Sequence, residues 1–179
     1  MKYYIRLLIL LMVSPFRKSV PLLGPCVTKL RVWPNDLDVF MHMNNGAYLT
    51  IMDLARTDMV IRSGMMKELF KRKWYPVVAA ETIRFKKPLK LFQRYEIETE
   101  VACWDHRAFY LVQTFSRNEQ FLAKAVVEAR FLSVNGRKIK AIEILSMMNC
   151  TEASPPMPGW IADWQRAQPA MSDIEYIEE

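Results

Sequence analysis

One long helical segment followed by several strand-like segments limits the fold of this chain more than any other feature. The segment from about residue 46 to residue 63 carries apolar residues at the spacing of one helix face: Tyr48, Met52, Ala55 and Met59. Asn44 or Asn45 is a good N-cap for this helix, and Gly64 is a good stop after it. The sequence therefore predicts one long helix here, with one face turned toward a core.

Strand-like stretches lie on both sides of this helix: residues 27–33 before it, and residues 75–85, 95–104, 109–116, 122–134 and 138–145 after it. The connections between the later stretches are short, and Asn135-Gly136 is the strongest short-range signal of a hairpin. Short helices are predicted over residues 65–72 and near 160–167. This order favours an α+β domain over residues 27–149, in which an antiparallel sheet wraps one face of the helix. Residues 1–26 and 150–179 flank it.

Composition narrows the class of protein. A chain of 179 residues that is 51% hydrophobic is long enough for one domain with a core. The net charge is +6, but the basic residues are dispersed and no nucleic-acid-binding motif appears, so no nucleic acid partner is expected. Three widely spaced cysteines fit neither a disulfide framework nor a metal site. We expect a cytoplasmic protein without a metal or redox cofactor.

The first 18 residues combine basic and apolar side chains. Their apolar run, residues 7–13, is too short to cross a bilayer, which takes roughly 20 residues. Three readings are open: a short helix packed on the domain, a secretory signal with a poor cleavage site, or a peripheral membrane anchor. In the anchor, Arg6, Arg17 and Lys18 would face lipid headgroups.

The segment from residue 36 to residue 48, DLDVFMHMNNGAY, concentrates the residues that could carry chemistry. Two acids, one histidine and two asparagines lie directly before a helix, whose first turn offers unpaired N–H groups and a partial positive charge. Such a terminus can stabilise an oxyanion, and a carboxylate close to it can attack a carbonyl or deprotonate a water. The alternative is that these residues only cap the helix and close the loop.

This segment resembles the active-site segment of the hotdog-fold thioesterases, including the 4-hydroxybenzoyl-CoA thioesterase group and the plant acyl-ACP thioesterases. The shared arrangement is D-x-D-x-x-x-H-x-N-N-x-x-Y, and the following DLAR is similar to an early motif of that family's central helix. Within the family, DLDVFMHMNN and WDHRAFYL resemble the vertebrate thioesterase superfamily member six and its bacterial relatives. The resemblance spans about residues 27–145 and implies a hotdog fold.

The resemblance also implies roles for individual residues. Asp38 matches the catalytic carboxylate, and Asn45, seven residues later, matches the helix-start residue whose backbone N–H faces the thioester oxygen. His42 is a third candidate for catalysis, or it orients the loop, as in the plant enzymes. Asn44 is a candidate substrate contact, and Tyr48 is expected in the core.

The activity implied is hydrolysis of an acyl-CoA thioester to a free acid and coenzyme A. A basic cluster after the strand at 75–85 could meet the phosphates of coenzyme A: Arg84, Lys86, Lys87 and Lys90. The resemblance further implies a homodimer or homotetramer, with the site where two subunits meet. The rivals are a catalytically silent acyl-binding or scaffold protein and a hotdog dehydratase, whose sequence pattern is absent here.

Overall fold

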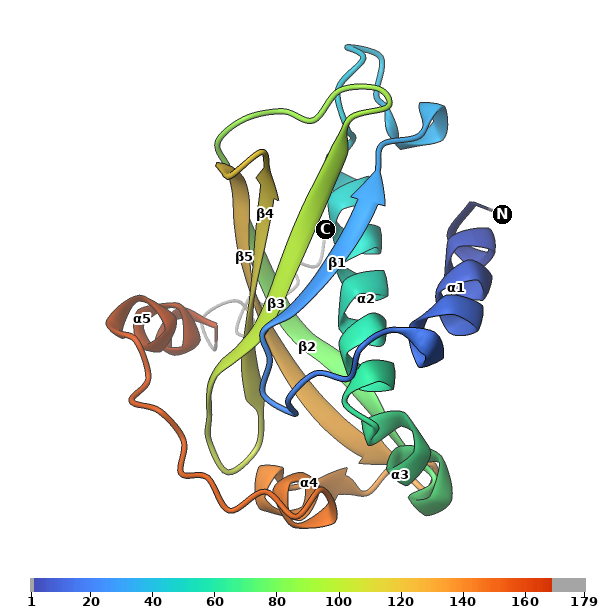
Figure 1. Cartoon of the computed structure of the whole chain (residues 1–179). Helices are drawn as coiled ribbons and strands as arrows, with labels where there is room; N and C mark the ends of the chain where they lie inside the picture. Colours follow the sequence, from blue (N-terminus) through green and yellow to red (C-terminus); the bar gives the residue numbers. More distant parts are fainter. Residues whose placement is uncertain (1, 169–179) are drawn as a thin grey trace, which may run out of the picture.

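The computed structural model describes residues 2–168, with the long helix at its centre and a curled antiparallel sheet around it (Figure 1). The helices are α1 (Lys2–Val13), α2 (Asn45–Arg62), α3 (Met65–Arg72), α4 (Ala141–Met147) and α5 (Gly159–Ala167), with 3-10 turns at Ser14–Phe16 and Pro34–Asp36. The strands are β1 (Cys26–Arg31), β2 (Trp74–Phe85), β3 (Arg94–Trp104), β4 (Phe109–Arg117), β5 (Gln120–Ser133) and β6 (Lys138–Ile139).

The described strands form one sheet in the order β1–β3–β4–β5–β2, and the short β6 pairs with β5. The predicted hairpins set this order: Asn118 and Glu119 both have positive φ between β4 and β5, and Gly136 has φ +78° between β5 and β6. Register shifts at residues 78–80 and 101–103 increase the local twist, so the sheet curls around α2. This is the predicted α+β arrangement, a helix wrapped by an antiparallel sheet.

Helix α2 begins and ends where the sequence predicts. Asn44 is its N-cap, with a side-chain oxygen that accepts from the Gly46 N–H, and Gly64 follows its last turn with φ +79°. Tyr48 lies in the core as predicted, and its ring contacts Phe115 of β4 at 5.1 Å between centroids. Because α2 is covered on more than one side, its buried face is wider than the stripe of a surface helix.

One predicted strand is wrong. Residues 138–145 alternate like a strand, yet only Lys138 and Ile139 pair with β5, and α4 follows from Ala141. The Glu143 side chain accepts from the Lys140 N–H at 2.9 Å and thereby caps the helix. Ala141, Ile144 and Leu145 are all buried at helical spacing, whereas a strand would place the neighbours Ile144 and Leu145 on opposite faces.

Helix α1 packs along α2 on the side away from the sheet, as the packed-helix reading of the N-terminus expects, and this packing leaves its outer face open to other contacts (Figure 1). The prediction that Arg6 faces lipid headgroups is wrong, because its guanidinium lies 2.6 Å from the buried Asp36 carboxylate and its side chain is 13% exposed. A buried carboxylate requires a cation or several hydrogen-bond donors, and Arg6 meets that need. The Arg17 guanidinium lies 3.3 Å from the buried Asp58 carboxylate, yet both Arg17 and Lys18 are exposed, so their contact with lipid stays a prediction.

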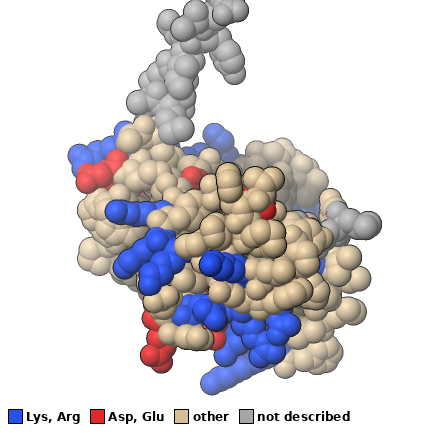
Figure 2. All heavy atoms as spheres, turned by 90° about the horizontal axis from the view of Figure 1, so that it is seen from above, with Lys and Arg blue, Asp and Glu red and all other residues tan. Residues whose placement is uncertain are grey.

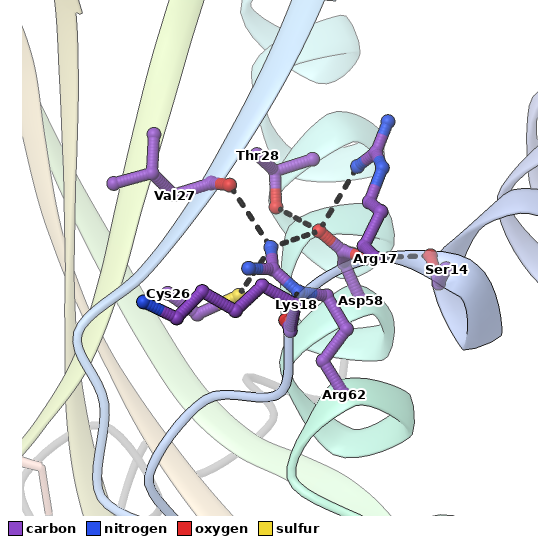
Figure 3. A network of polar contacts seen from close by, with 8 residues as sticks. All are labelled: Ser14, Arg17, Lys18, Cys26, Val27, Thr28, Asp58 and Arg62. Carbon is purple, nitrogen blue, oxygen red and sulfur yellow. Dashed lines mark hydrogen bonds and ion pairs between the residues drawn. The ribbon is translucent and has the colours of Figure 1, made fainter.

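Asp58 of α2 joins the N-terminal segment to the domain (Figure 3). Its carboxylate accepts hydrogen bonds from the hydroxyls of Ser14 and Thr28, at 2.5 and 2.9 Å, and from the guanidinium of Arg62 at 3.2 Å. One side chain thus connects the end of α1, strand β1 and the last turn of α2. Among residues 2–168, no helix is long and apolar enough to cross a membrane.

Candidate active site

The loop between β1 and α2 closes on itself as a small hairpin. The Asp38 N–H donates to the His42 carbonyl at 2.8 Å, and the Met41 N–H donates to the Asp38 carbonyl at 3.1 Å. Met41 adopts a positive φ of 61°, which the tight turn requires. Leu37 and Met43 pair across the base of the hairpin, so Asp38 stands at its first corner.

The Asp38 carboxylate is half-buried and only partly used by the loop. Its Oδ1 atom accepts from the backbone N–H groups of Phe40, at 2.9 Å, and His42, at 3.1 Å. Among the described residues no donor contacts Oδ2. The side chain is therefore fixed through one oxygen, and the other is left to act on a substrate or a water.

His42 contributes its main chain to this arrangement. Both its N–H and its carbonyl bond to Asp38, whereas its ring has no hydrogen-bond partner within the described chain. These contacts match the loop-orienting role that the sequence left open beside a catalytic one.

Asp36 has a different role from Asp38, although the sequence presents them as a pair. Its side chain is 1% exposed and pairs with Arg6 of α1. It also accepts from the Trp33 N–H at 2.8 Å, and its carbonyl accepts from the Asn44 N–H at 2.7 Å. Asp36 thus anchors both ends of the loop, and sequence reasoning missed its partner because Arg6 lies 30 residues away.

One backbone N–H group at the start of α2 has no acceptor among the described residues. The Gly46 N–H donates to the Asn44 side chain at 2.8 Å, and the Ala47 N–H donates to the Asn44 carbonyl at 2.9 Å. Within the described residues the Asn45 N–H has no acceptor. Since Asn45 is exposed and is the first residue of the helix, its N–H is available to a ligand oxygen at the positive end of the helix dipole.

The segment after β2 lies against the Asp38 hairpin. The Met43 N–H donates to the Leu89 carbonyl at 2.8 Å, and Lys90 pairs with His42 as an isolated bridge. Arg84, Lys86 and Lys87 are exposed at and just after the end of β2. The structure therefore brings the chain that carries the predicted basic cluster beside the hairpin, with Lys90 directly opposite His42.

An apolar cavity of about 180 Å³ lies between the second half of α2 and the sheet. Val60 of α2, Leu111 of β4 and residues 76–78 of β2 form part of its wall. Arg56 forms a polar part of the wall, and its burial lowers its pKa, an effect that the nearby Asp53 and Glu81 oppose. The α2 residues of this wall run from Asp53 to Val60 and beyond, which follow Asn45 by about 12 to 22 Å at 1.5 Å per residue, so the cavity is separated from the Asp38 hairpin of the same chain.

The site combines a carboxylate on a loop, a free helix N-terminus into which that loop leads, and an antiparallel sheet wrapped around the helix. Residues 32–165 match the family model of the thioesterase-like superfamily, which covers more than half of the chain. The chain therefore belongs to the thioesterase-like superfamily, as the resemblance implied.

Individual relatives agree with this assignment. Protein THEM6 of Xenopus laevis is 34% identical over 133 residues, a match that spans 74% of this chain and 63% of the frog protein. The probable thioesterase YbaW of Escherichia coli superposes with a TM-score of 0.63 at 22% identity, covering 68% of this chain and 97% of that chain. A mutant 4-hydroxybenzoyl-CoA thioesterase complexed with 4-hydroxybenzoyl-CoA superposes with a TM-score of 0.62 at 16% identity, covering 69% and 97%. These superpositions confirm the hotdog fold.

The two acids of the loop should respond differently to removal of their charge. Asp36→Asn leaves Arg6 nearly buried without its counter-charge, which should lower the free energy of unfolding by about 3 kcal/mol or more. Asp38→Asn keeps an oxygen that accepts from the same two N–H groups, so its loss should stay below about 1 kcal/mol. Urea unfolding of the two variants measures both values. A loss in Asp38→Asn equal to that in Asp36→Asn would show that Asp38 is a structural anchor as well.

Proposed function

We propose that the protein hydrolyses acyl-CoA thioesters to a free carboxylic acid and coenzyme A, with Asp38 as the residue that activates the attack. One observation carries this proposal: Asp38 is held through Oδ1 while Oδ2 has no donor in the described chain, in a loop that leads directly into a helix with an unclaimed first N–H. Membership of the thioesterase-like superfamily supports the same chemistry.

Thioester hydrolysis requires an attacking oxygen and a group that stabilises the oxyanion formed at the carbonyl. The free Oδ2 of Asp38 serves the first need in one of two ways: it attacks the carbonyl carbon itself, or it removes a proton from an attacking water. The Asn45 N–H serves the second need, because the helix dipole adds to its positive field. The thiolate of coenzyme A then leaves as the carbonyl re-forms. If water was the attacking group, this step releases the free acid. If Asp38 attacked, it leaves an acyl anhydride on Asp38, which a water hydrolyses to release the acid and restore the carboxylate.

The thiol portion of the substrate would extend toward the basic residues after β2. Arg84, Lys86 and Lys87 are exposed there, and Lys90 lies opposite His42 beside the hairpin. Phosphates carry several negative charges, so this rim would attract coenzyme A and hold it near the surface. Asn44 caps α2 through its side-chain oxygen, which accepts from the Gly46 N–H, and its exposed amide NH2 group is the part that would contact the substrate.

The acyl portion requires an apolar site. The cavity beside Val60 has an apolar lining, but it lies away from Asp38 of the same chain. Within one copy, Asp38 lies before the first residue of α2, whereas the cavity is lined by α2 residues from Asp53 onward. Strand β2 is an edge strand that pairs with β5 alone in the described chain, and it exposes Tyr75, Val78 and Phe85. An exposed apolar edge of this kind favours pairing with another chain.

Two copies paired antiparallel through β2 would resolve the mismatch. The Asp38 hairpin is tied to the end of β2 by the Met43–Leu89 hydrogen bond, while residues 76–78 near its start wall the cavity. A two-fold axis reverses one β2 against the other, so the hairpin of one subunit would come to the cavity of its partner. We therefore expect a homodimer, or a homotetramer built from such dimers, with each site shared between two subunits.

Removal of the Asp38 charge tests the proposed function. In a thiol-release assay on acyl-CoAs of graded length, Asp38→Asn should lower kcat by at least ~10², because the nucleophile or base is lost. Asp163→Asn removes an exposed carboxylate on α5 and is the matched control, expected to retain parental kcat. Hydrolysis at the parental rate by folded Asp38→Asn would remove Asp38 from the mechanism.

Replacement of Asn45 separates its N–H from its side chain. Asn45→Pro should lose roughly 10²-fold or more in kcat, the usual loss for one oxyanion donor, because proline has no N–H. Proline is well accepted at the first helical position, and the preceding Asn44 already has the extended backbone that proline requires, with φ −61° and ψ 140°. Asn45→Ala keeps the N–H and should retain most of the activity. If Asn45→Ala were as inactive as Asn45→Pro, the side chain would be the working group.

A further inference from the structure

Helix α1 is oriented with its polar groups inward. The Tyr3 hydroxyl donates to Asp53 at 2.6 Å, and the Arg6 guanidinium binds Asp36, so the polar side chains described within this helix turn toward the domain. Just after it, Ser14 is buried against Asp58 (Figure 3). Surface helices of globular proteins normally have the opposite arrangement, with polar groups toward water.

The outward face of α1 is entirely apolar over residues 4–13. Its exposed side chains, continued by the following turn, are Tyr4, Ile5, Leu8, Ile9, Leu11, Met12, Val13 and Phe16. Leu8 is 58% exposed and Phe16 is 90% exposed. The inward contacts to Asp36, Asp53 and Asp58 fix the rotation of the helix, so this face cannot turn into the core. A continuous exposed apolar face of this kind marks a site of contact with a membrane or another protein.

Three arginines without acidic partners lie beside this face. A groove along the free edge of β1 is lined by Ile9 and Val13 of α1 and by Arg31, Arg94 and Arg117. Arg31 and Arg94 stand directly opposite each other in the β1–β3 ladder, where like charges are destabilising. Within residues 2–168, no carboxylate pairs with any of the three. An anion bound in the groove would relieve this repulsion.

The charge of this end of the molecule agrees with an anionic partner. Strands β1 and β4 end, and β3 begins, at the upper end in Figure 1, and the view onto that end shows Lys and Arg dominating over Asp and Glu (Figure 2). Trp33 is half-exposed and lines the same groove. Tryptophan is favoured where a membrane meets water, because its ring is apolar and its N–H is polar.

We propose that the apolar face of α1 and the groove arginines Arg31, Arg94 and Arg117 form one surface that docks on an anionic phospholipid bilayer. The helix would lie in the plane of the interface with Leu8 and Met12 among the acyl chains, and the arginines would contact the headgroup phosphates. A helix of 12 residues is long enough for such a position. Lipid fits this surface better than a second copy, because Arg31, Arg94 and Arg117 in the groove call for an anionic partner, and the apolar strand edge open to pairing is the opposite one, β2.

Vesicle co-sedimentation of the full chain tests this surface. The parent should bind vesicles of phosphatidylcholine with phosphatidylglycerol, bind more weakly to phosphatidylcholine alone, and release from the anionic vesicles as salt is added. Leu8→Glu/Met12→Glu should abolish the binding, since it places charges in the face that enters the bilayer. Phe70→Glu/Ile142→Glu changes two exposed apolar residues on α3 and α4 and should bind like the parent.

The arginines supply a second arm of the same experiment. Arg31→Gln and Arg94→Gln should each lower partitioning onto anionic vesicles by about fivefold, which corresponds to roughly 1 kcal/mol per basic residue at the surface. Each variant also removes the repulsion between Arg31 and Arg94, so the urea midpoint of unfolding should stay the same or rise. Weaker vesicle binding would then not result from unfolding.

Equal binding by the parent and Leu8→Glu/Met12→Glu would overturn the proposal. The proposal would also be overturned if the parent bound neither kind of vesicle and Leu8→Glu/Met12→Glu eluted as a smaller assembly than the parent. In that case the apolar face of α1 would join copies of the chain.

Discussion

The buried carboxylate of Asp36 connects the parts of this protein on which its chemistry depends. It binds Arg6 of α1 and the backbone at Trp33, and its carbonyl holds the N–H of Asn44, the cap of α2. A carboxylate at 1% exposure is costly unless each of these partners is in place, so the loop between β1 and α2 has little freedom. The Asp38 hairpin lies within that loop, and its geometry follows from the anchor on either side of it.

The same anchor links the hairpin to the outer surface of the molecule. Arg6 contributes its charge to Asp36 and also donates to the Arg31 carbonyl at the end of β1, which holds α1 beside that strand. Because the polar side of α1 is used in this way, its apolar side is left to face outward. If α1 rests on a bilayer, the shared anchor would hold the Asp38 hairpin at a fixed position relative to that surface.

Features that depend on residues close together in the sequence, such as helix spacing, caps and hairpin turns, were predicted correctly. The spacing of Tyr48 and Met52, the Asn44 cap and the hairpin at Asn135-Gly136 all led to the observed elements, and Asp38 was correctly placed directly before the helix. The strand prediction for residues 138–145 failed because apolar residues there recur at both strand and helix spacing. The Glu143 side chain caps a helix at this point and so favours the helix. The ion pairs of Arg6 and Arg17 could not be read locally, since their carboxylates lie 30 and 41 residues away. The distance between Asp38 and the cavity, likewise, is a property of the folded chain.

If each site combines Asp38 of one subunit with the cavity of its partner, two inactive variants should restore activity when they assemble together. Asp38→Asn removes the carboxylate, Val60→Trp fills the cavity, and both homo-oligomers should be inactive in the thiol-release assay while they elute like the parent. When the two chains are mixed at equal amounts by co-expression, hybrid dimers would each hold one intact site, so about a quarter of the parental activity should return. If the mixture, with hybrid dimers confirmed by native mass spectrometry, stays as inactive as its components, the carboxylate and the acyl cavity belong to the same subunit and the account of a shared site is wrong.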